Sequence, residues 1–128
     1  MRHRESNIQI QCVRYFSLQY PEYTWRTTDG HFGSLLNSVP NGGHRSATEA
    51  AIMKAEGVVP GVADLELNIA RGGYHGLKIE MKTDDKASRQ RETQREWQKR
   101  IEQQGYKYVV CRSVMDFINT IDGYLKQQ

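Results

Sequence analysis

The sequence predicts one mixed α/β domain with a central sheet flanked by helices, because three kinds of pattern alternate along its 128 residues. Helical stripes with capping signals, short runs that alternate polar and apolar residues, and glycine-rich turns follow one another. The expected order is helix, strand, helix, strand, strand, helix, strand and helix. A chain of this length suits one hydrophobic core, so we expect a single domain over residues 1–128.

The first segment, residues 5–19, fits two structures. The stretch "IQIQCV" alternates with a period of two, as a strand does. Ile8, Cys12 and Phe16 also share one face at helical spacing, and Pro21 ends the segment late, which favours a helix.

The next patterns predict a loop, a short strand and a capped helix. Residues 22–34 contain Gly, Asp and Thr and are expected to form the loop, and 34–39 the strand, which the turn signal "PNGGHRS" ends. A helix is expected over 46–56, because its first residue and Glu49 have capping-box spacing and Gly57 fits just past its end.

Two strands, 62–69 and 77–81, are expected on either side of the glycine-rich turn "ARGGYHG". Side chains alternate across a strand, so each of these strands has one apolar and one polar face. The polar faces carry Asp64, Glu66 and Asn68 on one strand and Lys78, Glu80 and Lys82 on the other. Antiparallel pairing would bring the acidic residue at the start of the first strand close to the one near the end of the second.

The C-terminal part predicts a helix, a strand and a second helix. The first helix is expected over 88–104, ended by Gly105, and the strand over 106–111, which is rich in Tyr and Val. Ser113 and Asp116 have capping-box spacing at the start of the last helix.

Composition excludes several classes of protein. No apolar run approaches the roughly 20 residues that a membrane span requires, and the first residues have no apolar core of a secretory signal. Cys12 and Cys111 are isolated thiols without metal-ligand spacing, which is typical of core residues in a cytoplasmic protein. The net charge of +3 permits a polyanionic partner, and basic residues crowd the segment 89–100.

The polar faces of the paired strands indicate a metal site. Two neighbouring carboxylates, Asp64 and Glu80, repel each other, and a hard divalent cation offsets that repulsion. With the backbone carbonyl of Met81 they would leave positions open for water and a phosphate oxygen, within reach of Lys82. This arrangement suits hydrolysis of a nucleic-acid phosphodiester. The alternative is an ordinary solvent face on which Glu80 pairs with Lys78 or Lys82.

The stretches "PNGG", "KAEGVVPGVADLEL", "GLKIEMKT" and "GYKYVVCRS" together resemble the VRR-NUC domain, a branch of the PD-(D/E)XK nuclease superfamily. The resemblance runs from about residue 5 to residue 124. It implies a PD-(D/E)XK (restriction-endonuclease-like) fold with a central mixed sheet flanked by helices. It also implies a Mg²⁺- or Mn²⁺-dependent endonuclease acting on DNA, of the stand-alone type found in phages and bacteria.

The resemblance assigns roles residue by residue. Asp64 and Glu80 resemble the metal-binding carboxylates, and Lys82 resembles the catalytic lysine. Glu5 resembles an acidic residue on the first helix beside the metals, acting directly or indirectly, and this favours a helix for 5–19.

A glutamine on the helix after these strands is also implied. Gln94 resembles it, and lies on one expected helical stripe with Gln90, Trp97 and Ile101. The connection before Gln94 is longer than is usual in the family, so Gln90 is an alternative. A glutamine half-covered at the margin of the core is the alternative to an active-site role.

Contacts to DNA are expected from His44 and Arg45, in a loop that resembles one of the family, and from Arg89 and Arg91. A tight turn and a solvated helix face are the alternatives for these residues. The resemblance to Holliday-junction resolvases implies a homodimer on branched or duplex DNA, since a two-fold dimer presents two sites to two strands. The rival functions are a DNA-binding module that kept the fold without the chemistry, and a structural protein with an acidic face.

Overall fold

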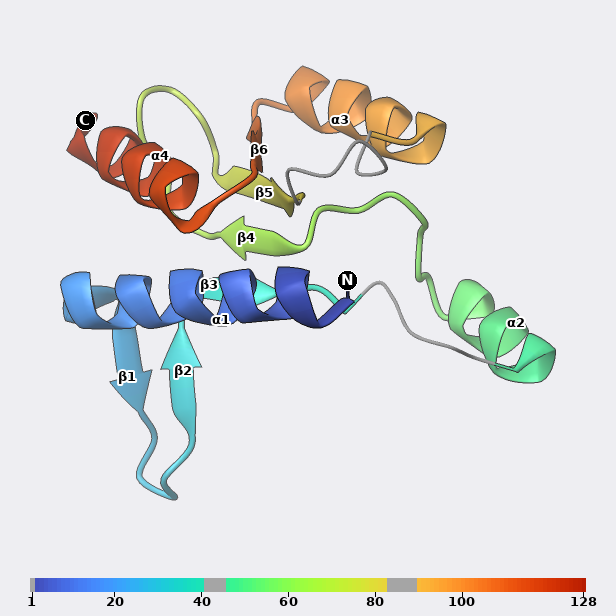
Figure 1. Ribbon diagram of the computed structural model, residues 1–128, viewed down its shortest axis with the longest axis horizontal. Coiled ribbons are helices and arrows are strands. Elements are labelled where there is room, and N and C mark those ends of the chain that lie inside the picture. Colours follow the sequence, from blue (N-terminus) through green and yellow to red (C-terminus); the bar gives the residue numbers. More distant parts are fainter. Residues whose placement is uncertain (1, 41–45, 83–89) are drawn as a thin grey trace.

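We describe the protein from a computed structural model, which covers the backbone of residues 2–40, 46–82 and 90–128 and, within these ranges, the side chains from residue 6 onward. It is an α/β structure with a mixed four-stranded sheet (Figure 1). The strand order is β3-β4-β5-β6, for β3 Leu36–Ser38, β4 Leu65–Leu67, β5 Leu77–Met81 and β6 Lys107–Cys111. The first two pairings are antiparallel and the β5–β6 pairing is parallel. The strand expected over 34–39 is present only in its central part, as β3. The strand expected over 62–69 is likewise shorter in the structure, where β4 has three residues.

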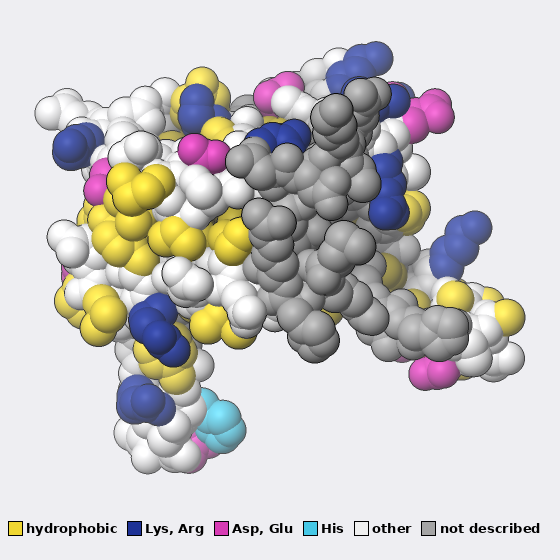
Figure 2. Space-filling model, viewed as in Figure 1, with side chains coloured by type: hydrophobic (Ala, Val, Ile, Leu, Met, Phe, Trp, Pro, Cys, Tyr) yellow, Lys and Arg dark blue, Asp and Glu magenta, His cyan; other side chains and the backbone are white. Residues whose placement is uncertain are grey.

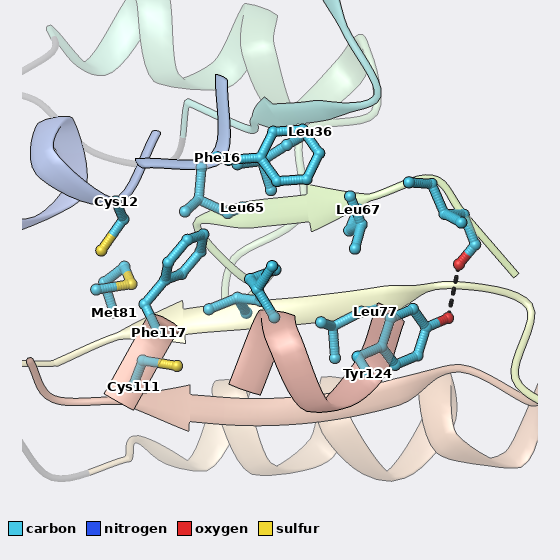
Figure 3. Packing of buried hydrophobic residues seen from close by; sticks show 13 residues of the cluster. Cys12, Phe16, Leu36, Leu65, Leu67, Leu77, Met81, Cys111, Phe117 and Tyr124 are labelled. Carbon is cyan, nitrogen blue, oxygen red and sulfur yellow. Dashed lines mark hydrogen bonds between the residues drawn. The ribbon is translucent and has the colours of Figure 1, made fainter. Parts of the chain in front are cut away.

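The main core lies on one face of this sheet, under α1 (Arg2–Gln19) and α4 (Val114–Lys126). The expected apolar faces of the two central strands are confirmed, because Ala63, Leu65, Leu67, Ile69, Leu77, Ile79 and Met81 are all buried. Cys12 and Phe16 from α1 and Phe117 from α4 belong to the same buried cluster (Figure 3). Burial raises the pKa of both free thiols, Cys12 to about 12 and Cys111 to about 11, which suits inert core residues.

Two hydrogen-bonded groups attach the helices to this core. The buried hydroxyl of Tyr124 donates to the Ile69 carbonyl at 2.6 Å (Figure 3). Asp122 of α4 accepts from the hydroxyls of Tyr15, at 2.8 Å, and Tyr20, at 2.6 Å, and so ties α1 to α4. The strand alternative for residues 5–19 is wrong, because the apolar stripe of that segment is buried as one helical face.

The helix α3 (Glu92–Gln103) lies on the other face of the sheet, where it packs against β6. Trp97 packs edge-on against Tyr108 of β6, with ring centroids 6.1 Å apart. The helix begins later than the residue 88 expected from the sequence, because Arg91 is its N-cap. Gln90 therefore lies before the helix, and its expected place on a helical stripe with Gln94 is wrong.

The capping signals elsewhere were predicted correctly. The helix α2 (Ala47–Ala55) begins after Ser46, whose hydroxyl accepts from the Glu49 amide at 3.1 Å in a capping box. Ser113 caps α4, because its hydroxyl accepts from the Asp116 amide at 3.1 Å.

The prediction of a loop over 22–34 is wrong. A short 3₁₀ helix, η1 (Pro21–Tyr23), leads into a two-stranded antiparallel hairpin of β1 (Thr24–Arg26) and β2 (Phe32–Ser34). The polar turn residues hid strands of only three residues each, too short to show a period of two. No helix in the described part of the chain is long and apolar enough to cross a membrane.

Candidate active site

Two carboxylates meet where β4 begins and β5 ends. Leu65 pairs with Ile79, so the next position of the same antiparallel register sets Asp64 opposite Glu80. The Asp64 carboxylate accepts a hydrogen bond of 2.8 Å from the Met81 amide, which fixes it against the end of β5. The proximity of the two acids expected from the sequence is confirmed.

Glu80 is buried rather than solvent-facing, with 4% of its surface exposed. Burial, followed by the charge of Asp64 and a hydrogen bond with it, raises the pKa of Glu80 from 4.5 to about 8. The charge of Lys82 and the hydroxyl of Tyr108, which lies 3.5 Å from Oε1, act in the opposite direction. The polar face of the strands is therefore an enclosed site in which negative charge is unfavourable unless a cation offsets it.

Gln94 joins this carboxylate to the amine of Lys82. Its Nε2 donates to Glu80 Oε2 at 3.2 Å, and its Oε1 accepts from Lys82 Nζ at 2.9 Å. The same oxygen accepts from the backbone amide of Arg91 at 2.8 Å, at the N-terminus of α3. One side chain in the first turn of α3 thus sets the positions of the acid and the amine.

The backbone of Lys82 is fixed as well, because its amide donates to the Cys111 carbonyl at 2.9 Å in continuation of the β5–β6 pairing. The alternative pairing of Glu80 with Lys78 is wrong. Lys78 forms its ion pair with Glu66, at 2.9 Å, one step further along the same face.

Of the two glutamines weighed from the sequence, Gln94 contacts Glu80 and Lys82. Gln90 lies one layer further out, where its Nε2 donates to Gln98 Oε1 at 2.7 Å and to the Tyr108 hydroxyl at 3.3 Å. It reaches Glu80 only through Tyr108.

The remaining predicted site residues are placed in part. Glu5 lies in α1, but its side chain is outside the described residues, as are His44, Arg45 and Arg89. Arg91 is exposed at the start of α3. Met81 is the last residue of β5, and its amide, as noted above, binds Asp64.

Two residues of this region were not predicted from the sequence. Tyr108 links Gln90 to Glu80 through its hydroxyl. A tyrosine in "YKYVVC" is typical of a strand, so its sequence position did not indicate a role in the site. Gly61 has φ of +91°, and a Cβ there would lie 2.5 Å from the backbone of Thr93. The segment before Asp64 therefore packs directly on the first turn of α3. In the sequence, only the glycine in "PGV" indicated such a close approach.

The donors here suit a hard divalent cation such as Mg²⁺ or Mn²⁺. They are carboxylate oxygens, and burial together with the charge of Asp64 raises the pKa of Glu80. No cluster of three or more His, Cys, Asp or Glu side chains occurs among the described residues, so any such ion would take its further ligands from backbone, water or substrate.

Comparisons with known proteins identify relatives over nearly the whole chain. The family model described as "VRR-NUC domain" matches residues 3–115. A solved structure titled "VRR_NUC domain protein" superposes with a TM-score of 0.72 and 29% sequence identity, over 96% of this chain and 88% of that chain. No curated protein matches the sequence.

Proposed function

The chain belongs to the VRR-NUC family of nuclease domains, and from this premise we propose that residues 1–128 form one metal-dependent endonuclease domain of PD-(D/E)XK fold that hydrolyses DNA phosphodiester bonds. The observation that carries the proposal is the polar cluster at the end of β5. Asp64 and Glu80 face each other there, and Gln94 holds Glu80 and Lys82 together. Two acids and one amine in an enclosed site are suited to water activation beside a phosphate.

Asp64, Glu80 and the carbonyl of Met81 would hold Mg²⁺ or Mn²⁺, with Glu5 contributing directly or through water. When bound, such an ion polarises the phosphoryl group and lowers the pKa of bound water. Its charge would also favour the ionised form of Glu80, whose pKa burial raises.

Lys82 would orient the attacking water and offset the negative charge that develops on the phosphate. Its amine is held by Gln94 Oε1 at 2.9 Å, so the amine is already placed before substrate arrives. Gln94 is therefore a positioning residue in this proposal.

We further propose that the substrate is branched DNA and that the protein acts as a homodimer. Support for the dimer comes from α2, which buries none of its residues and is followed by exposed Val58 and Val59. An isolated helix of about nine residues is marginal in water, so we expect a binding partner to bury Ile52 and its neighbours. A second copy would also supply a second site for the second strand. Arg91, exposed beside the site, is a proposed contact to the DNA backbone.

The proposal is tested with labelled single-stranded, duplex, flap and four-way-junction DNA incubated with Mg²⁺, Mn²⁺ or EDTA. We expect cleavage only with metal, and losses of about 10²–10⁴-fold for Lys82→Ala and Glu80→Ala. The matched controls are Lys78→Ala and Glu66→Ala, which break the neighbouring ion pair on the same face. Unchanged cleavage in Glu80→Ala would refute the site, and salt-dependent binding without cleavage would indicate a DNA-binding module.

A further inference from the structure

The β1–β2 hairpin projects from the body and carries exposed aromatic residues. It forms a sheet of its own, separate from the four-stranded sheet (Figure 1). Trp25 and Phe32 are 48% and 51% exposed, which is unusual for such large apolar side chains. Figure 2 shows basic and hydrophobic side chains together on this projection. We call Trp25, Arg26 and Phe32 the aromatic hairpin surface.

The base of the hairpin is firmly attached to the core. Tyr23 stacks on buried Phe16, with ring centroids 6.3 Å apart. The Tyr23 carbonyl accepts from the Leu35 amide at 3.0 Å, and its hydroxyl accepts from Arg71 at 2.9 Å. The aromatic hairpin surface is thus presented from a fixed base.

The two aromatic rings lie on opposite faces of the hairpin. Trp25 pairs with Gly33, and its indole lies against that glycine, where a Cβ would come within 2.2 Å of the ring. Phe32 pairs with Arg26, whose guanidinium carbon lies 5.6 Å from the ring centroid. Successive pairs in a ribbon face opposite sides, so one ring is displayed on each side.

From this geometry we propose that the aromatic hairpin surface stacks on unpaired bases of the nucleic-acid substrate, at a branch or a single-stranded segment. This inference rests on the proposed nuclease function. Flat aromatic rings beside an arginine are the groups that bind single-stranded bases, whereas the bases of a blunt duplex are already stacked on one another.

The charges of the hairpin are compatible with a polyanion. Arg26 is exposed, and the one acidic side chain among residues 24–34, Asp29, pairs with His31 at 3.2 Å. The display of rings on both sides also favours bases over a flat protein surface. A protein partner would bury one face of the hairpin, whereas a hairpin inserted at a DNA branch would contact bases on both of its faces.

The hairpin lies at a different place on the substrate from the chemistry. The Val39 amide pairs with the Asp64 carbonyl, and Ser34 ends the hairpin five residues earlier in the chain. A bend at Leu35 separates the hairpin from β3, and β3 alone spans about 10 Å, or roughly three base-pair steps. Stacking and cleavage are therefore separable in experiments.

The first test uses the fluorescence of Trp25. The chain has two tryptophans, so Trp97→Phe leaves Trp25 as the only tryptophan while keeping a ring against Tyr108, and excitation at the red edge of the absorption band avoids the tyrosines. In EDTA, we expect a single-stranded oligonucleotide and a four-way junction to quench Trp25 emission and to shield it from acrylamide, and a blunt duplex to do so far less. Binding of each DNA is followed independently by anisotropy of a dye on the DNA.

The second test uses variants in the otherwise wild-type chain. Trp25→Ala should weaken binding of the junction and the single strand by about 5- to 150-fold, the effect of losing one base–aromatic stack. Trp25→Phe should retain most of the affinity. Leu18→Ala, which removes an apolar side chain that is 77% exposed on α1, should change nothing.

The outcomes separate this inference from the proposed function. If DNA binds and is cleaved but Trp25 emission and the Trp25→Ala affinity do not change, the inference is overturned and the nuclease proposal stands. If no DNA is bound or cleaved at all, both are overturned. If Trp25 emission instead changes with protein concentration alone, the surface contacts a second copy and the base-stacking inference is wrong.

Discussion

Lys82 and Gln94 are joined by a hydrogen bond of 2.9 Å from Nζ to Oε1, and the other end of the same amide donates to Glu80 at 3.2 Å. The amide oxygen also accepts the Arg91 backbone amide, so the first turn of α3 orients the whole group. The separation between the Glu80 carboxylate and the Lys82 amine is thus set by Gln94 at the N-terminus of α3 as well as by β5, which ends one residue before Lys82.

Replacing Gln94 by Ala is expected to lower kcat by about 100-fold with little change in KM, because the Lys82 amine loses the partner that positions it. Steady-state cleavage kinetics measure both constants. Gln98→Ala is the matched control, since Gln98 bonds Gln90 and not the site. If Gln94 acts through Lys82, the Gln94→Ala/Lys82→Ala double variant should be no slower than Lys82→Ala alone. Fully additive losses would contradict this.

Replacing Gly61 by Ala is expected to lower the free energy of unfolding by about 1–3 kcal/mol and to reduce cleavage as well. The added Cβ would meet the backbone of Thr93 at 2.5 Å, at a residue with φ of +91°, and would push the segment before Asp64 away from the first turn of α3. Gly73→Ala is the control, because its φ of +85° is similar but nothing lies within 4 Å. Urea denaturation measures the stability of both variants, and a cleavage assay measures their specific activity. We expect only Gly61→Ala to lose activity, and equal losses of activity in the two variants would disprove the packing argument.

Replacing Tyr124 by Phe is expected to lower the free energy of unfolding by about 1–3 kcal/mol, because it leaves the buried Ile69 carbonyl without its 2.6 Å donor. Tyr15→Phe should cost less, since Asp122 keeps the hydroxyl of Tyr20 at 2.6 Å. Thermal and urea unfolding measure both. A larger loss in Tyr15→Phe than in Tyr124→Phe would contradict the ranking.

Periodicity and capping predicted most of the fold because they report local chemistry. Ser46 and Ser113 begin their helices as their spacing indicated, and the alternation around Leu65 and Ile79 gave the buried face. Short strands escaped the same reasoning. Trp25 and Phe32 belong to strands of three residues, held by pairing across a turn that composition alone made look like a loop.

The proximity of Asp64, Glu80 and Lys82 was predicted from the sequence, but the enclosure of Glu80 was not. Asp64 and Glu80 share a register that strand alternation could indicate. The burial of Glu80 depends on α3, which lies on the same face of the sheet as this carboxylate. The contact between Glu80 and Tyr108 depends on the parallel strand β6, because the two residues are 28 positions apart in the sequence. Such long-range contacts leave no local signal, so the sequence left an ordinary solvent face open as the alternative to a metal site.

The stability of the metal-free protein is expected to fall as pH rises from about 5 to about 8. The pKa of Glu80 is raised from 4.5 to about 8 in the folded state, so the folded state holds a proton that the unfolded state has released. The slope contributed by one such proton is at most ~1.4 kcal/mol per pH unit. Urea unfolding in EDTA across this range, for wild type and Glu80→Gln, measures it.

The difference between those two proteins isolates Glu80, because the histidines and the facing groups Asp64, Lys82 and Tyr108 are present in both. Glu66→Gln is the matched control, since Glu66 is paired with Lys78 outside the site. Adding Mg²⁺ or Mn²⁺ should flatten the wild-type slope, because a cation favours the ionised carboxylate, and should leave Glu80→Gln nearly unaffected. Parallel curves for wild type and Glu80→Gln in EDTA would show that Glu80 is ionised in the metal-free fold, and would remove the electrostatic reason for a cation at this position.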